Sequence, residues 1–293
     1  MKTLTDLFSS RPRTFSLEIF PPKTEKGLLA LEAALKELAG LGPDFISVTY
    51  GAGGGNRDRT LGLVRLIQER HNILALHHFT CVLHTRKEIR GILDHLQKVK
   101  VRSLLALRGD PPKDRPDWVP GPENFRYSSE LVAFIREHYG DSFSIGVAGF
   151  PEGHPLAADK DADARVLKAK IESGGEFVIT QLFFDNALYF DYVRRVRTLG
   201  VTARIIPGIL PVTSYEGVVN FCKGCGASVP DKVHDIFSPI AQDPDKTREA
   251  GIRFAIDQCR ELLARGAPGI HLYTLNKAEP ATQIVSELRR MSL

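Results

Sequence analysis

An acidic residue stands near the end of one predicted buried strand, and two prolines follow it. The stretch FSLEIFPP (15–22) alternates apolar side chains with others, as a β-strand does. Leu17 and Ile19 would then face packed helices while Glu18 faces the opposite side, and Pro21-Pro22 would end the strand. Burial raises the pKa of a carboxyl group, so Glu18 could hold a proton ready for transfer. The alternative is a structural ion pair.

A second predicted strand ends in the same way, in LRGDPP (107–112). Arg108 has the planar fork that binds phosphate oxygens. Gly109 lets a ligand approach the backbone closely. Asp110 could orient a ring N–H group or shape the charge around a redox-active ring. A strand cap with a surface ion pair is the competing interpretation.

Short β-branched or apolar runs alternate with amphipathic helical stretches along the whole chain. We predict eight strands, at 14–20, 44–50, 73–82, 103–109, 144–150, 177–184, 203–210 and 269–276. Eight strand–helix units favour a closed (β/α)8 TIM barrel over the doubly wound open sheet that is its main rival. Residues 1–293 are expected to form this single domain.

Polar or aromatic residues gather where these strands end, which is where a TIM barrel carries its chemistry. They are Glu18, Thr49, Tyr50, His78, Arg108, Gly109, Asp110, Phe150, Glu152, His154, Gln181, Tyr273, Asn276 and Lys277. Since His77 and His78 point to opposite faces of one strand, only one of them can face the barrel mouth. We select His78, which lies nearer the strand end. The pattern predicts a ligand site.

Composition narrows the class of protein. The 293 residues are 43% hydrophobic and 25% charged, with a net charge of +4, as in soluble globular proteins. Neither a membrane span nor a signal peptide is recognisable, which predicts a cytoplasmic protein. The basic residues are too dispersed to indicate nucleic-acid binding, and no convincing metal-ligand set is present. Cys222 and Cys225 have redox or zinc spacing, but a second such pair is missing.

A glycine-rich turn at 51–56, GAGGGN, follows the second predicted strand. It approaches the GxGxxG pattern of dinucleotide-binding folds, but Asn56 occupies the third glycine position. The following strand also lacks a terminal acid for a ribose. The fingerprint therefore fails, although the turn could lie under a flat ligand.

Eight short motifs together resemble the 5,10-methylenetetrahydrofolate reductase family, in the bacterial form that has only the catalytic barrel. They are FSLEIFPPKT, SVTYGAGG, HFTC, LRGDPP, PEGHP, ITQLFFD, IPGILPV and HLYTLNK, which occur in the family's order between residues 15 and 277. The resemblance implies non-covalent FAD and ping-pong hydride transfer from NADH or NADPH. The product would be 5-methyltetrahydrofolate, which supplies one-carbon metabolism and methionine synthesis.

The resemblance also implies roles for individual residues. Glu18 matches the acid that protonates the folate, and Asp110 matches a residue near the flavin and the pterin. The positions that match substrate contacts are Glu18, Gln181, Tyr215, Tyr273 and Lys277. Those that match flavin contacts are Thr49, Tyr50, Ala52, His78, Arg108, Gly109, Asp110, Tyr127, Ser128, His154, Asp163 and Lys170.

Two other functions remain open for such a barrel. A flavin-free, pterin-dependent methyltransferase would need a separate methyl acceptor, and a binding or regulatory barrel would tolerate the loss of Glu18 and Asp110. The sequence does not separate NADH from NADPH or from a protein electron donor. A homo-oligomer is compatible with the helices, but periodicity shows no self-complementary surface.

Overall fold

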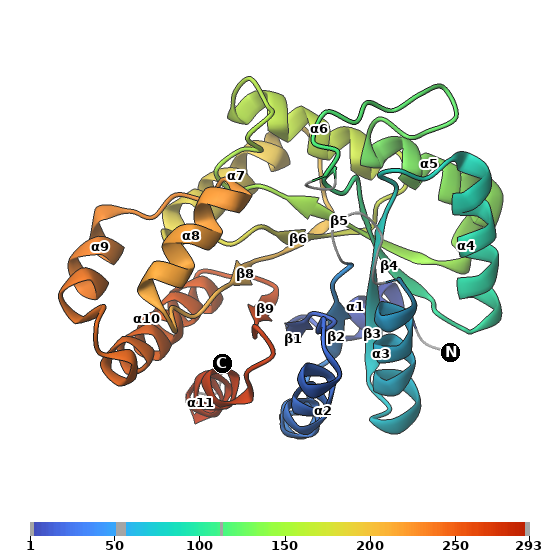
Figure 1. Ribbon diagram of the computed structural model, residues 1–293. Helices are drawn as coiled ribbons and strands as arrows, with labels where there is room; N and C mark the ends of the chain where they lie inside the picture. Colours follow the sequence, from blue (N-terminus) through green and yellow to red (C-terminus); the bar gives the residue numbers. More distant parts are fainter. Residues whose placement is uncertain (1–2, 51–56, 112–113, 291–293) are drawn as a thin grey trace.

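The protein is a barrel of parallel strands surrounded by helices (Figure 1). A computed structural model describes residues 3–50, 57–111 and 114–290. The strands are β1 (Thr14–Ile19), β2 (Phe45–Val48), β3 (Leu74–Thr80), β4 (Ser103–Leu107), β5 (Ser144–Gly149), β6 (Phe177–Thr180), β7 (Arg204–Ile206), β8 (Gly208–Ile209) and β9 (Gly269–Tyr273). The predicted TIM-type barrel is therefore confirmed.

Helices follow the strands in the alternation that the sequence predicts. They are α1 (Leu4–Ser10), α2 (Glu25–Gly40), α3 (Arg57–Arg70), α4 (Arg86–Lys98), α5 (Ser128–Tyr139), α6 (Lys160–Glu172), α7 (Asn186–Thr198), α8 (Tyr215–Cys225), α9 (Asp231–Phe237), α10 (Pro244–Ala264) and α11 (Ala278–Arg290). Polar caps fix several of their starts; Thr85, for example, forms a capping box with Glu88 at α4. Among the described residues, no helix is both long and apolar enough to cross a membrane.

The barrel closes through a strand that is broken at Pro207. The range 203–210 was predicted as one strand, but the structure divides it into β7, which pairs with β6, and β8, which pairs with β9. Proline lacks the N–H that a continuous ladder needs. The Pro207 carbonyl accepts the His271 N–H at 3.0 Å, and Thr180 Oγ1 accepts the Gly208 N–H at 3.0 Å. These two bonds join the halves of the break to both neighbouring strands.

Alternation along the strands separates two apolar cores. Leu17 and Ile19 point outward into the large core between the strands and the helices, as predicted. Inside the barrel, near the N-terminal ends of the strands, a second core holds Leu4, Leu7, Phe45, Leu76, Leu105, Phe177, Ile179 and Ile206. The N-terminal half of the barrel interior is therefore filled with side chains, which leaves the opposite end for chemistry.

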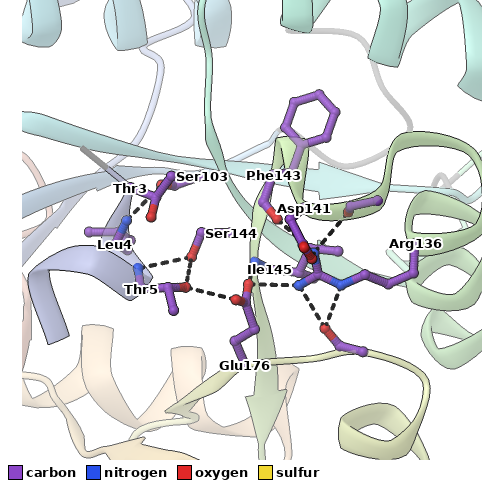
Figure 2. Close-up of polar contacts among 12 residues, drawn as sticks. Thr3, Leu4, Thr5, Ser103, Arg136, Asp141, Phe143, Ser144, Ile145 and Glu176 are labelled. Atoms are coloured by element: carbon purple, nitrogen blue, oxygen red, sulfur yellow. Dashed lines mark hydrogen bonds and ion pairs between the residues drawn. The ribbon is translucent and has the colours of Figure 1, made fainter. Parts of the chain in front are cut away.

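Helix α1 plugs the N-terminal end of the barrel, which the sequence analysis did not foresee. Figure 2 shows its contacts: Thr5 Oγ1 lies 2.6 Å from Ser144 Oγ and donates to Glu176 Oε1 at 3.0 Å. The other oxygen of Glu176 accepts the Ile145 N–H at 2.7 Å and pairs with Arg136 at 2.7 Å. These bonds attach α1 to β5 and α5, and Leu4, the first residue of α1, is fully buried.

Replacing Leu4 by alanine should destabilise the protein, because the side chain is fully buried in the inner core. The expected loss is about 2–5 kcal/mol in the free energy of unfolding, measured by chemical denaturation. Leu29→Ala is the matched control, since Leu29 lies on α2 with 69% of its surface exposed. Equal effects of the two changes would show that α1 is not packed as described.

Candidate active site

Glu18 lies inside the barrel, among polar side chains of three other strands. Its Oε2 atom is 3.3 Å from His78 Nε2 on β3 and 3.4 Å from His271 Nε2 on β9. Ser47 on β2 donates its hydroxyl to the same oxygen at 3.2 Å. The Glu18 side chain keeps only 15% of its surface exposed. We call Glu18, Ser47, His78 and His271 the Glu18 cluster.

The electrostatics of this cluster correct one expectation. Burial alone would raise the pKa of Glu18, as the sequence analysis assumed, but His78 and His271 together outweigh burial and hold that pKa at about 2. The raised pKa is therefore wrong for the protein without ligands, in which Glu18 is a carboxylate near neutral pH.

The His271 ring is fixed by further contacts on the side away from Glu18. Its Nδ1 atom lies 2.8 Å from Ser16 Oγ, and its ring stacks on Phe45 with centroids 5.9 Å apart. Phe45 belongs to the inner apolar core. His271 therefore connects that core to the Glu18 carboxylate, and its ring cannot turn without breaking contacts on both sides.

The loop after β9 fixes the end of β1, where Glu18 sits. Thr274 donates its hydroxyl to the Glu18 carbonyl at 2.7 Å. The Asn276 side chain accepts the Phe20 N–H at 2.9 Å and donates to the Phe20 carbonyl at 2.8 Å. Asn276 and its neighbour Leu275 both have positive φ, at 61° and 48°. Such a conformation is costly for these residues, so the surrounding bonds must maintain it.

Tyr273, on β9, and Gln181, which follows β6, lie near the strand break at Pro207. The Tyr273 hydroxyl donates to the Thr180 carbonyl at 2.8 Å, and Gln181 Oε1 accepts the Leu182 N–H at 2.9 Å. A Cβ atom at Gly208 would lie 2.7 Å from the Tyr273 hydroxyl and 2.4 Å from the Thr180 oxygen, so only glycine fits beneath the tyrosine ring. Tyr215 begins α8, and its hydroxyl bonds to His234.

A basic cluster of Arg108, His154 and Lys170 lies on neighbouring loops and on α6. Burial, then Lys170 and Arg108, lower the pKa of His154, while Asp110 acts in the opposite direction. Burial also lowers the pKa of Lys170, against the attraction of Asp163. The Lys170 ammonium donates to the Ala148 carbonyl at 3.1 Å and lies 5.5 Å from the centre of the Phe150 ring. The structure thus brings these predicted residues together.

Other predicted positions are more scattered. His78 faces the interior as predicted, and His77 faces outward, where its ring contacts Tyr50 with centroids 5.9 Å apart. Tyr50 is therefore on the outer side, and burial raises its pKa to about 12. Asp110 and Lys277 are exposed, as is Tyr127, whereas Ser128 is buried and Thr49, Gly109 and Tyr215 are partly exposed. Ala52 and the glycine-rich turn lie outside the described residues.

Ser16, Ser47 and His271 were missed by the sequence analysis, which looked only at strand ends. The signal was nevertheless present, because Ser16 and Glu18 are two apart on β1, as are His271 and Tyr273 on β9. The register pairs Ser16 with His271 and Glu18 with Tyr273. Period-two alternation alone would therefore have placed these side chains on the inner face.

Two further features concern ligands. A hollow of ≈ 680 Å³ opens outside the barrel between α7, α9 and α10, and none of the predicted site residues lines it. Within residues 3–50, 57–111 and 114–290, we find no group of three or more His, Cys, Asp or Glu side chains that could hold a metal ion.

The sequence is similar to one family of known proteins along almost its whole length. The sequence profile of the methylenetetrahydrofolate reductase family matches residues 3–289. Methylenetetrahydrofolate reductase 1 of Schizosaccharomyces pombe is 37% identical over 276 residues, covering 94% of this chain and 46% of that protein. The chain thus spans about half the length of this relative. The 5,10-methylenetetrahydrofolate reductase of Salmonella typhimurium is 36% identical, with 93% and 90% of the two chains covered.

One solved structure has the same fold over almost the whole chain. It is an uncharacterised Clostridium thermocellum protein that binds two copies of 5-methyl-5,6,7,8-tetrahydrofolic acid. The TM-score is 0.66 with 98% of both chains covered, and the sequence identity is 16%. At that identity the likeness concerns the fold.

The low pKa of Glu18 predicts an acid-dependent loss of stability. An ionised group whose folded pKa is about 2 stabilises the protein above the unfolded pKa, and this stabilisation disappears as pH falls towards 2. We therefore compare the free energies of unfolding of the parent and of Glu18→Gln. As the pH falls from 6 to 3, the parent should lose about 2 kcal/mol relative to the variant. Urea denaturation at each pH measures it. A difference that does not change with pH would contradict the ionised carboxylate.

Proposed function

The chain belongs to the methylenetetrahydrofolate reductase family, and we propose that it reduces 5,10-methylenetetrahydrofolate to 5-methyltetrahydrofolate with FAD and a reduced nicotinamide nucleotide. The observation that carries this proposal is the Glu18 carboxylate, held inside the barrel within 3.4 Å of two imidazoles. Such a group can move a proton onto a bound substrate. The reaction would supply methyl groups for one-carbon metabolism and methionine synthesis.

The residues present suit the binding of FAD. A diphosphate needs positively charged donors, which Arg108 and Lys170 would provide; both lie near enough to His154 to lower its pKa. The Thr80 hydroxyl, at the end of β3, is buried without a hydrogen-bond partner among the described residues. A polar ligand at the mouth would satisfy it. When bound, the flavin would accept hydride from the nicotinamide and pass hydride to the folate.

Glu18 would act on the folate through a change in its own surroundings. Folate entering the mouth displaces water from the 15% of the side chain that is now exposed. Further desolvation raises the pKa of a carboxyl group, which favours the uptake of a proton by Glu18 when the folate binds. Glu18 would then protonate N10 of the five-membered folate ring, so that the ring opens to an iminium at N5. Proton donation of this kind contributes roughly 10²–10⁴ in rate.

Other side chains would orient the substrate. Lys277 is exposed at the rim and carries a positive charge that suits the glutamate tail of a folate. The amide of Gln181 and the rings of Tyr215 and Tyr273 lie on one wall and offer hydrogen bonds and stacking surface. Asp110, with 91% of its side chain exposed, would face the pterin and the flavin from the opposite loop.

The alternative that the sequence left open, a flavin-free methyltransferase, is not favoured by the family match. It would transfer the methyl group of a pterin to a separate acceptor and would need no nicotinamide. Absorbance separates the two, since the purified protein should be yellow with FAD and should bleach anaerobically with NADH or NADPH. A colourless protein that cannot be loaded with FAD would favour the alternative.

Glu18→Gln should separate the two half-reactions. Flavin reduction by NADH or NADPH should proceed within a few-fold of the parent rate, because it requires no proton from Glu18. Reoxidation of the reduced flavin by methylenetetrahydrofolate should slow by roughly 10²–10⁴. Anaerobic stopped-flow absorbance measures both steps. Glu32→Gln, on an exposed position of α2, is the control, and normal folate reduction by Glu18→Gln would exclude the acid role.

Lys170→Met should weaken FAD binding, because it removes a buried positive charge and keeps most of the side-chain volume. A lost charge-assisted hydrogen bond corresponds to a roughly 10- to 100-fold higher Kd. Quenching of FAD fluorescence during titration measures it. Lys168→Met is the matched control, since Lys168 lies on the same helix and pairs with Glu172 at the surface. Unchanged affinity in Lys170→Met would remove Lys170 from the proposed FAD site.

A further inference from the structure

Helix α8 carries two free cysteines, one turn apart, at its C-terminal end. Cys222 is buried, with 1% of its surface exposed, and Cys225 is half-buried. Each thiol shifts the pKa of the other, and the Cys225 thiol donates to the Cys222 carbonyl oxygen at 3.7 Å. The two thiols thus form a neighbouring pair with one accessible and one protected member.

The accessible member is also the more reactive thiol. The Cys222 side chain lowers the pKa of Cys225, and the Ala227 backbone acts in the same direction, although burial acts against them. By contrast, burial raises the pKa of Cys81 and of Cys259. Since the thiolate is the nucleophile in disulfide exchange, Cys225 is the cysteine that would react first.

The end of α8 is attached to a loop of the candidate active site. Gly226 follows the helix with φ of 74°, and a Cβ atom there would lie 2.2 Å from Pro155. The Ser228 N–H donates to Glu152 Oε1 at 3.0 Å. Glu152 and Pro155 flank His154, which belongs to the basic cluster. A movement of the last turn of α8 would therefore reach this loop.

The same helix also lies close to two residues that we propose as substrate contacts. Cys222 belongs to an apolar cluster with Leu210, Val212 and Val218, and Tyr215 and Tyr273 pack against that cluster. In Figure 1, α8 lies on the same side of the barrel as α9 and α10. The cysteine pair is thus close to the candidate site without contributing to the Glu18 cluster.

We propose that Cys222 and Cys225 form a modification site, at which a low-molecular-weight disulfide oxidises the pair reversibly to an intramolecular disulfide. The Cys225 thiolate attacks the disulfide and releases one thiolate, which leaves a mixed disulfide on Cys225. The Cys222 thiol then loses its proton and attacks that mixed disulfide, so that the second thiol departs. The protein loses two electrons and two protons, and the oxidant becomes two thiols.

Oxidation should also alter the shape of the helix end. Side chains three apart on a helix have Cβ atoms about 5–6 Å apart, whereas a disulfide needs about 3.5–4.5 Å. The last turn of α8 must therefore contract by about 1 Å or more. Because Ser228 lies three residues beyond Cys225, this contraction is expected to break its bond to Glu152.

Mass spectrometry tests the modification site. The full-length protein is incubated with glutathione disulfide at pH 7.5, its free thiols are alkylated, and its peptides are compared with a reduced sample. We expect the peptide containing both cysteines to lose two hydrogens. Cys81 and Cys259 should stay reduced and should react with the alkylating reagent only after the protein is unfolded. Cys222→Ser should stop at a glutathione adduct on Cys225, and Cys225→Ser should leave Cys222 unmodified. A pair that stays reduced, or a first reaction at Cys81 or Cys259, overturns the proposal.

Hydrogen–deuterium exchange tests the structural consequence. Peptides covering 150–158 and 226–229 should exchange several-fold faster in the oxidised protein, and the reductant dithiothreitol should restore the original rate. Cys222→Ser/Cys225→Ser is the control, since glutathione disulfide should not change its exchange. Oxidation that leaves both segments unchanged would overturn the link between α8 and the loop that contains His154.

Discussion

The inward direction of Glu18 is the constraint on which the rest of the structure depends. Side chains alternate along β1, so packing Leu17 and Ile19 against the helices turns Glu18 into the barrel. Closure of the sheet then brings β9 beside β1, and His271 arrives next to the carboxylate because the register pairs it with Ser16. A shift of one residue in β1 would expose the apolar side chains and remove the acid from the mouth.

The barrel interior has two parts with different tasks. Towards the N-terminal ends of the strands, α1 and the inner apolar core exclude water and support Phe45, on which the His271 ring stacks. Towards the C-terminal ends, serine, histidine and glutamate side chains of neighbouring strands contact one another. The rigid lower half positions the polar upper half, in the way that preorganised sites are built. The β9–α11 loop adds to this by fixing the backbone of Phe20 through Asn276.

Much of this arrangement was predictable from the sequence. Alternating strands and helices were enough for the TIM barrel, and position in the strand was enough to choose His78 over His77. The break at Pro207 and the plug formed by α1 were not foreseen, because both depend on contacts distant in sequence. The pKa of Glu18 was misjudged for the same reason: burial is readable from a strand pattern, whereas the opposing effects of His78 and His271 require the arrangement of β3 and β9 around β1.

The most direct test of the account is a crystal structure of the protein with FAD and 5-methyltetrahydrofolate. We predict that the flavin lies at the barrel mouth with its diphosphate against Arg108, His154 and Lys170. The pterin should lie on the flavin with its N10 atom within hydrogen-bond reach of Glu18, directly or through one water. Binding of the flavin or the folate in the outer hollow between α7, α9 and α10, away from Glu18, would contradict the account.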